Sequence, residues 1–249
     1  MTDLRSPLVE FLGVSKNYGP KPAVVDLTLS LYPGEVFAFL GPNGAGKTTT
    51  IKILTGLLRP SAGSVRIAGQ ESAFESADAR QVLSYVPDQP HVYEKLTGRE
   101  FLEFVRELYG LSGPDVAADV DRLVDVFEMG GFLDDLAETY SHGMRQRLAF
   151  AGALLHRPKV LVLDEPMVGL DPKSMRIVKD LLRREAAAGM CVFMSTHTLA
   201  IAEELADRVG IIQRGRLIRC GSLSDIRSEF AVGHTLEDFF LEITREGTP

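Results

Sequence analysis

The chain has 249 residues, 45% of them hydrophobic, and a formal net charge of −7. This length and composition suit one compact α/β domain with a full core, and the excess of acidic residues disfavours a nucleic-acid partner, because phosphate backbones are bound by clustered Lys and Arg. The small number of cysteines, two, argues against a disulfide framework or a zinc site. The sequence shows no signal-peptide pattern, and no apolar run approaches the roughly 20 residues needed to cross a bilayer, so we expect a cytoplasmic protein without a membrane span.

The N-terminal segment alternates apolar and polar residues. Val9 and Phe11 begin one alternating stretch, and Leu27, Leu29 and Leu31 end a second one after the turn residues 19–22. Alternation of this kind is typical of half-buried strands. The pattern predicts an N-terminal antiparallel β subdomain that leads into an apolar strand at 36–40.

A glycine-rich loop follows that strand and reads GPNGAGKTT. Its glycines let backbone N–H groups turn toward phosphates, Lys47 supplies charge to the β and γ phosphates, and Thr48 offers a hydroxyl to Mg²⁺. A helical pattern with Ile51 and Leu54 on one face leaves the loop, which directs a helix N-terminus at the anion. We therefore predict a nucleotide site made by Gly41, Pro42, Asn43, Gly44, Ala45, Gly46, Lys47, Thr48 and Thr49.

Later in the chain, short apolar runs recur between helical segments. Such runs suit parallel strands that are buried on both faces, with the helices as crossovers. We expect a P-loop NTPase core with a mostly parallel sheet, and the runs stand at 83–86, 160–163, 191–194 and 209–212.

Between residues 95 and 157 the pattern becomes entirely helical. Thr97 and Glu100 form a capping box before one helix, and a second amphipathic stretch covers 116–127. We interpret this region as an all-helical insertion in a single domain, with the nucleotide-binding core at 1–94 and 158–249. A short amphipathic helix is predicted at 236–244.

The run VLVLDEP ends an apolar strand with two adjacent carboxylates, Asp164 and Glu165. Strand alternation would point the two side chains in different directions. We expect Asp164 to hold Mg²⁺ through its water shell and Glu165 to face the attacking water. Taken alone, the run could also be a strand cap before a proline turn.

A second helix N-terminus stands in YSHGMRQR at 140–147. Ser141 is a suitable N-cap and Gly143 permits close approach, so the segment can bind an anion. An ordinary capped helix is the alternative interpretation.

The order of these motifs, followed by GLDP at 169–172 and STH at 195–197, resembles the ATPase of an ATP-binding cassette (ABC) transporter over nearly the whole chain. The resemblance implies a head-to-tail dimer that holds two ATP molecules, each between the Walker A loop of one subunit and the signature segment of the other. It assigns Ser141 and Gly143 to the γ-phosphate bound by the partner and Asp171 to the interface.

The same resemblance assigns two further residues. His197 would bond the γ-phosphate in its own subunit, and Tyr18 would stack on adenine with a π face. Simpler alternatives are a satisfied histidine at a strand end and a surface tyrosine, and Asp171 could be a helix cap before Pro172.

The sequence departs from the family pattern in two places. In YVPDQP, Asp88 stands where a glutamine is usual and Gln89 follows it; we assign Asp88 to that role, as a possible Mg²⁺ ligand near the reacting phosphate, with Gln89 as the alternative. In the signature segment, His142 replaces a usual glycine, Met144 a usual glutamine and Tyr140 a leucine. Since backbone N–H groups and Ser141 bind the phosphate, we expect function to survive.

The signature form, the acid at Asp88 and the ending TLEDFFLEIT resemble cassettes that export drugs, antibiotics, lipids or polysaccharides. The resemblance implies an ATPase on the inner face of the membrane, bound to permease subunits and to a second ATPase subunit that is a copy or a paralogue. The competing interpretations are an importer ATPase, a soluble cassette adaptor, and a regulatory nucleotide sensor that barely hydrolyses ATP.

Overall fold

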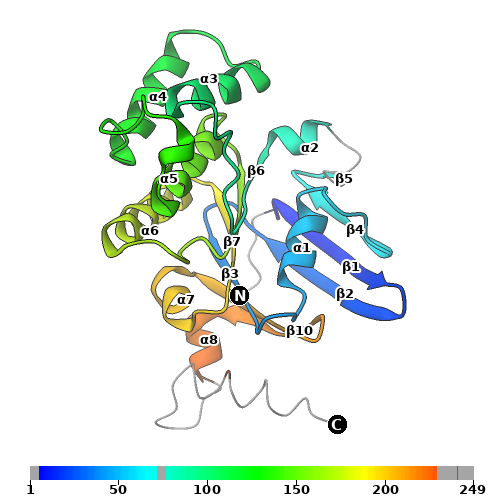
Figure 1. Cartoon of the computed structure of the whole chain (residues 1–249). Helices are drawn as coiled ribbons and strands as arrows, with labels where there is room; N and C mark the ends of the chain where they lie inside the picture. The colour runs from blue at the N-terminus through cyan, green and yellow to red at the C-terminus, as the bar shows by residue number, and fades with distance from the viewer. Residues whose placement is uncertain (1–5, 72–76, 229–239, 241–249) are drawn as a thin grey trace.

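The computed structural model describes residues 6–71, 77–228 and 240 (Figure 1). Its first sheet is antiparallel and four-stranded, which confirms the expectation for residues 9–31. The sequence reading missed its second hairpin, which turns at Ala68 and Gly69 with positive φ angles of 51° and 78°. In the order β2-β1-β4-β5, the strands are β1 (Val9–Tyr18), β2 (Lys21–Leu31), β4 (Ala62–Ile67) and β5 (Gln70–Glu71).

The second sheet has six strands in the order β10-β9-β3-β8-β7-β6. Every neighbouring pair is parallel except β9 and β10, which form an antiparallel hairpin. The mostly parallel core sheet is thus confirmed, and all four predicted apolar runs are strands in it. The strands are β3 (Val36–Leu40), β6 (Leu83–Val86), β7 (Val160–Asp164), β8 (Cys191–Thr196), β9 (Arg208–Gln213) and β10 (Arg216–Ser222).

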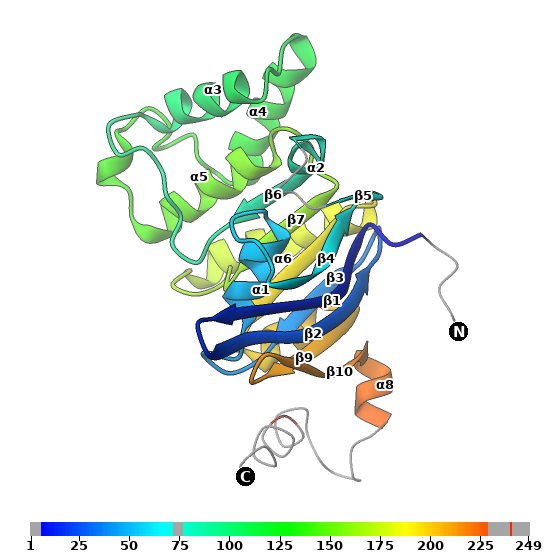
Figure 2. The same ribbon diagram turned by 90° about the vertical axis from the view of Figure 1, so that its right-hand side faces the viewer.

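Strand alternation distributes the parallel sheet between two hydrophobic cores. In β3, Val36, Ala38 and Leu40 join the core that includes the helical insertion, whereas Phe37 and Phe39 join the core shared with the antiparallel sheet. Helix α1 (Lys47–Leu54) contacts β2 of one sheet and β7 of the other. The phosphate-binding loop that precedes α1 is therefore fixed between the two sheets (Figure 2).

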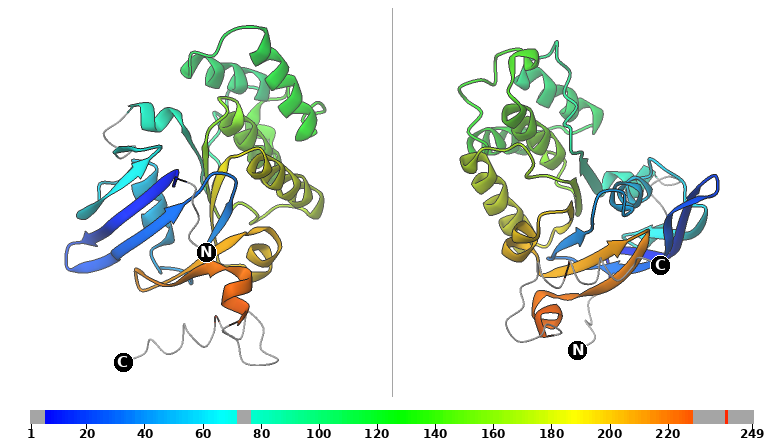
Figure 3. Two further views of the ribbon diagram at one scale, coloured as in Figure 1. Left: turned by 180° about the vertical axis from the view of Figure 1, so that it is seen from behind. Right: turned by 60° about the horizontal axis from the view of Figure 1, so that its bottom comes forward.

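The insertion at 95–157 contains helices and no strand, apart from an isolated bridge between Thr97 and Leu136. Thr97 and Glu100 form the predicted capping box. Figures 1 and 3 place these helices at the end of the molecule opposite α8 (Leu223–Ser228). Its elements are α3 (Gly98–Leu108), α4 (Pro114–Val126), the 3₁₀ turn η1 (Ala137–Thr139) and α5 (His142–Leu154).

The core adds α2 (Ala77–Gln81), α6 (Pro172–Ala187) and α7 (Leu199–Leu205). No helix among the described residues is long and apolar enough to cross a membrane. The helix predicted at 236–244 lies outside the described residues, except for Phe240.

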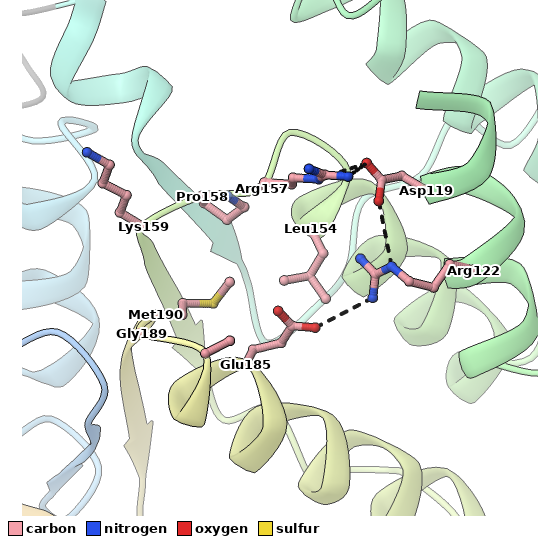
Figure 4. A pocket seen from close by; sticks show the side chains of 10 residues that line it. Asp119, Arg122, Leu154, Arg157, Pro158, Lys159, Glu185, Gly189 and Met190 are labelled. Atoms are coloured by element: carbon pink, nitrogen blue, oxygen red, sulfur yellow. Dashed lines mark hydrogen bonds and ion pairs between the residues drawn. The ribbon is translucent and has the colours of Figure 1, made fainter. Parts of the chain in front are cut away.

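An ion-pair network joins the insertion to the core around a cavity of about 540 Å³ (Figure 4). Asp119 on α4 pairs with Arg157 at 2.7 Å, and Arg122, one turn further along α4, lies 3.6 Å from Glu185 on α6. The ammonium of Lys159 points away from this cluster. The pair of Arg122 and Glu185 thus crosses the boundary between insertion and core, while Asp119 and Arg157 pair within the insertion.

A second ion pair holds the turn before β3. Glu35, only 3% exposed, accepts hydrogen bonds from Arg208 at 3.0 Å and from the backbone N–H of Tyr32 at 2.7 Å. Burial outweighs these contacts and raises the pKa of Glu35. The guanidinium of Arg208 also lies over the ring of Phe37, 5.4 Å from its centroid. Arg208 on β9 therefore supports the start of the central strand.

Removal of Arg208 leaves a buried carboxylate without its cation. We expect Arg208→Met to lower the free energy of unfolding by about 3 kcal/mol, as for other broken buried pairs. A carboxyl with a raised folded-state pKa binds protons more tightly when folded, so stability falls as the pH rises from the unfolded pKa of about 4.3. The loss of unfolding free energy in Arg208→Met, measured by urea titration, should be larger at pH 8 than at pH 5. The double variant Glu35→Gln/Arg208→Met should recover part of this loss, because it has no buried carboxylate at position 35.

Candidate functional site

The phosphate-binding loop is held in place by its backbone. Gly46 is the N-cap of α1 with a φ of 115°, and a Cβ there would lie 2.5 Å from the carbonyl oxygen of Ala23. The N–H of Gly215 donates to the carbonyl of Ala45 at 2.8 Å, so strand and hairpin residues brace the loop from outside. Only glycine fits at position 46, since any side chain would meet backbone.

Lys47 is buried at the centre of this loop. Its ammonium donates to the carbonyl of Gly41 at 2.7 Å and lies 3.6 Å from Oε1 of Glu165. A cation in this position can hold the β and γ phosphates of a nucleotide as a point charge. The predicted charge of the loop is therefore placed next to the predicted hydrolytic carboxylate.

A cavity of about 300 Å³ opens over the loop. Half of the Tyr18 side chain is exposed at the end of β1, and Lys16 lies 5.8 Å from the centre of its ring. The structure thus brings a π face to the loop, as adenine stacking requires. Gly41 and Ala45 are buried behind the cavity, and its lining comprises Tyr18, Lys21, Pro22, Ala23, Pro42, Asn43, Gly44, Gly46, Lys47, Thr48 and Thr49.

Asp164 lies at the end of β7 and joins three segments. Its Oδ2 accepts from the Thr48 hydroxyl at 3.0 Å, and its Oδ1 accepts from the hydroxyl of Ser195 on β8. A hydroxyl and a carboxylate beside a phosphate site are the oxygen ligands that Mg²⁺ prefers, together with water and substrate phosphates. The residues present therefore fit Mg²⁺. The sequence reading missed Ser195 as a site residue, although it is the first residue of the STH motif.

Glu165 follows Asp164 in a left-handed backbone conformation with a φ of 49°. Its N–H donates to the carbonyl of Ser195 at 3.1 Å. The prediction that strand alternation sets the direction of the Glu165 side chain is wrong, because β7 ends at Asp164. The left-handed backbone conformation of Glu165 sets this direction. The carboxylate is directed toward Lys47 and His197.

His197 follows β8, and its Nδ1 lies 2.9 Å from Oε1 of Glu165. The histidine is therefore satisfied at a strand end, one of the two predicted alternatives. If Nδ1 of the neutral ring donates to Glu165, Nε2 can only accept, so donation to a phosphate from this position requires the imidazolium. The phosphate role of His197 stays a prediction.

The signature segment lies away from the loop cavity. Ser141 caps α5 by accepting from the N–H of Met144 at 3.3 Å. A Cβ on Gly143 would lie 3.7 Å from Oδ2 of Asp171, which itself caps α6. The Ser174 hydroxyl, at 2.6 Å, lowers the pKa of Asp171. Both caps are confirmed, and the loop cavity is lined by residues between 18 and 49, so the signature segment of the same chain does not line it.

Asp88 and Gln89 line a separate cavity of about 490 Å³ beside the signature segment. Burial, with smaller effects of the charges on Asp164 and Asp88, raises the pKa of Tyr85 to about 12. Asp88 is therefore near the same tyrosine as the Mg²⁺ candidate Asp164. The geometry does not choose between Asp88 and Gln89, and the assignment of Asp88 stays a prediction.

Comparison with known proteins agrees with this geometry. The family model for the ABC transporter matches residues 24–168. The daunorubicin/doxorubicin resistance ATP-binding protein DrrA of Streptomyces peucetius is 40% identical over 220 residues, which cover 88% of this chain and 67% of that protein. The Nod factor export ATP-binding protein I of Burkholderia orbicola is 38% identical, over 86% of this chain and 70% of that protein.

A solved structure described as the ATP-binding subunit of an ABC transporter shares 34% sequence identity with this chain. It superimposes with a TM-score of 0.89 over 95% of this chain and 99% of the solved chain. The two-sheet core and the helical insertion are therefore present in a related protein.

Glu165 is the group best placed to accept a proton from water at the loop. We expect Glu165→Gln to lower kcat for ATP hydrolysis at least ~100-fold, the usual contribution of a positioned base, while nucleotide binding remains. Phosphate release and the binding of a fluorescent ATP analogue measure the two effects. The matched control is Glu185→Gln in the remote network of Figure 4, which should turn over ATP like the wild type. Equal turnover by Glu165→Gln would contradict the assignment.

Proposed function

The chain belongs to the ABC transporter family, and on that premise we propose that its ATPase cycle drives export of a solute through a separate membrane permease. It is a transport-coupled ATPase that converts ATP and water to ADP and phosphate. The observation that carries the proposal is the meeting of Lys47, Asp164 and Glu165 at one loop. A phosphate-binding cation, an Mg²⁺ ligand and a base are the groups that this reaction needs.

Each group at the loop is proposed to have a distinct role in ATP hydrolysis. The loop N–H groups and Lys47 bind the β and γ phosphates, and Glu165 orients the attacking water and takes its proton. His197 and Lys47 hold the Glu165 carboxylate at this position. Mg²⁺, held by Thr48 and Asp164, would supply charge to the phosphates as they react.

The site is proposed to be completed by a second ATPase subunit. Ser141 and Gly143 stand at a helix N-terminus that can bind an anion, but they do not line the loop cavity of their own chain. A head-to-tail dimer related by a two-fold axis would place each signature segment against the other chain's loop, so two sites form together. Asp171, next to Gly143, would lie at this interface. The partner is a copy of this chain or a paralogue.

Export is the proposed direction because the relatives named above act in drug resistance and in Nod factor export. We propose a drug, an antibiotic, a lipid or a polysaccharide as the class of cargo. The membrane subunits would select it.

The permease is proposed to dock on exposed apolar side chains of the helical insertion and of the segment just before it. Tyr93 is 58% exposed and contacts Phe104 edge to face at 5.2 Å, while Leu108, one turn after Phe104 on α3, is 69% exposed. Exposed apolar patches of this kind mark interaction sites. A cytosolic segment of the permease on this patch would keep the subunit on the inner face of the membrane.

The shared site predicts complementation between two inactive variants. Lys47→Ala removes the phosphate-binding cation of its own loop but leaves the signature segment intact. Ser141→Arg blocks the signature segment but leaves the loop intact. In an equal mixture half of the dimers are mixed, and each has one whole site, so ATPase activity should rise above that of either component, to at most about one quarter of the wild-type rate.

Each variant alone should be inactive at the same total protein concentration, and circular dichroism checks that both are folded. A mixture no more active than its components would disprove the two-chain site.

The docking patch predicts loss of membrane association without loss of the ATP site. Tyr93→Glu/Leu108→Glu should reduce co-purification with the permease at least ~10-fold, because charged groups would be buried against apolar side chains, while nucleotide binding stays unchanged. The matched control is Leu57→Glu, which changes an exposed leucine that follows α1, outside the helical insertion. If both variants co-purify equally with the permease, the patch is not its docking site.

A further inference from the structure

The N-terminal turn of α5 is bonded to the loop between β7 and α6. Nε2 of His142, the first residue of the helix, lies 3.2 Å from the carbonyl oxygen of Val168. A carbonyl can only accept, so Nε2 carries the proton and donates. One turn later, Nε2 of Gln146 donates to the carbonyl of Pro166 at 3.5 Å. The two side chains share a helix face and hold the same loop.

The contact is close as well as polar. Gly169 has a positive φ of 74°, and a Cβ there would lie 3.0 Å from Cδ2 of His142. The imidazole therefore fills the space above this glycine. A displacement of the α5 N-terminus must therefore move the loop or break the hydrogen bond to it.

The same loop begins with Glu165. The N–H of Val168 donates to the carbonyl of Glu165 at 3.2 Å, so the two residues form one turn. The Glu165 carboxylate then contacts His197 and Lys47. A continuous series of bonded groups thus runs from Ser141, through His142 and Val168, to the catalytic carboxylate.

These two ends serve different ATP molecules in the proposed dimer. Ser141 would contact the nucleotide on the partner's loop, whereas Glu165 acts on the nucleotide of its own chain. We propose that His142 is a positioning residue that couples the two sites: engagement of the signature segment at one nucleotide holds the Val168 carbonyl, and through it Glu165, in place at the other. The inference rests on the proposed two-chain site.

The coupling belongs to the side chain of His142 and to its hydrogen bond. A glycine at this position, the residue that the family pattern usually has, could not reach Val168. Asp88, Glu94 and Arg145 line the same cavity, but the bond does not depend on the charge of the ring, because the neutral Nε2–H form and the imidazolium both donate.

Two variants separate the hydrogen bond from packing. His142→Leu fills similar space without a donor, and His142→Gln keeps an N–H at the end of the side chain. We expect wild-type ATP hydrolysis to be cooperative in ATP, with a Hill coefficient above 1, and coupling of at least ~5-fold between sites. His142→Leu should lower the Hill coefficient to about 1, and His142→Gln should restore it.

The readout is steady-state ATPase activity against ATP concentration, with thermal unfolding as the check on folding. ATP-analogue binding to the loop of dilute single chains should be equal in all three proteins. A wild-type Hill coefficient of 1, an unchanged coefficient in His142→Leu, or failure of His142→Gln to rescue would each overturn the inference. Any rise in activity above both components when Lys47→Ala is mixed with Ser141→Arg supports the dimer, whatever the size of the coupling, so such a rise alongside any of these results removes the coupling alone.

Discussion

The hydrogen bonds that Asp164 accepts from Thr48 and Ser195 are the constraint on which the candidate site depends, because they join the helix after β3 to the ends of β7 and β8. Strands β3, β8 and β7 are adjacent and parallel, so their carboxyl ends meet at one edge of the sheet. That edge is where open α/β sheets bind ligands. The position of Glu165 follows from the same constraint, since its N–H bonds to the Ser195 carbonyl.

Much of this arrangement can be predicted from the sequence. The apolar run at 83–86 coincides with β6, and the capping box at Thr97 begins α3 where expected. These predictions were confirmed because local chemistry determines both features. An unbroken apolar run suits a strand buried on both faces, and a threonine three residues before a glutamate can bond the unpaired backbone N–H groups at the start of a helix.

Other features depend on contacts between segments that are distant in sequence. The direction of Glu165 comes from one left-handed residue that Ser195, thirty positions later, holds by hydrogen bonds. The hairpin β4–β5 needs the edge of β1 for pairing, and its only local signal is the turn at Ala68 and Gly69. In the proposed dimer, the choice between Asp88 and Gln89 would depend on the nucleotide and the partner chain, which no local pattern specifies.

The helical insertion is connected to the core by two kinds of contact that differ in their consequence. In the network of Figure 4, the pair of Arg122 and Glu185 joins the insertion to the core at 3.6 Å, and an ion pair between such partly exposed groups stabilises little and tolerates rearrangement. Helix α5 contacts the loop 165–171 by two directional hydrogen bonds, one from the exposed His142 at 3.2 Å and one from the buried Gln146 at 3.5 Å. A tilt of the insertion toward a partner's nucleotide would therefore cost little at the network but would displace the loop that carries Glu165. The insertion thus shares directional bonds with the loop that carries Glu165, and the proposed coupling between the two sites would act through these bonds.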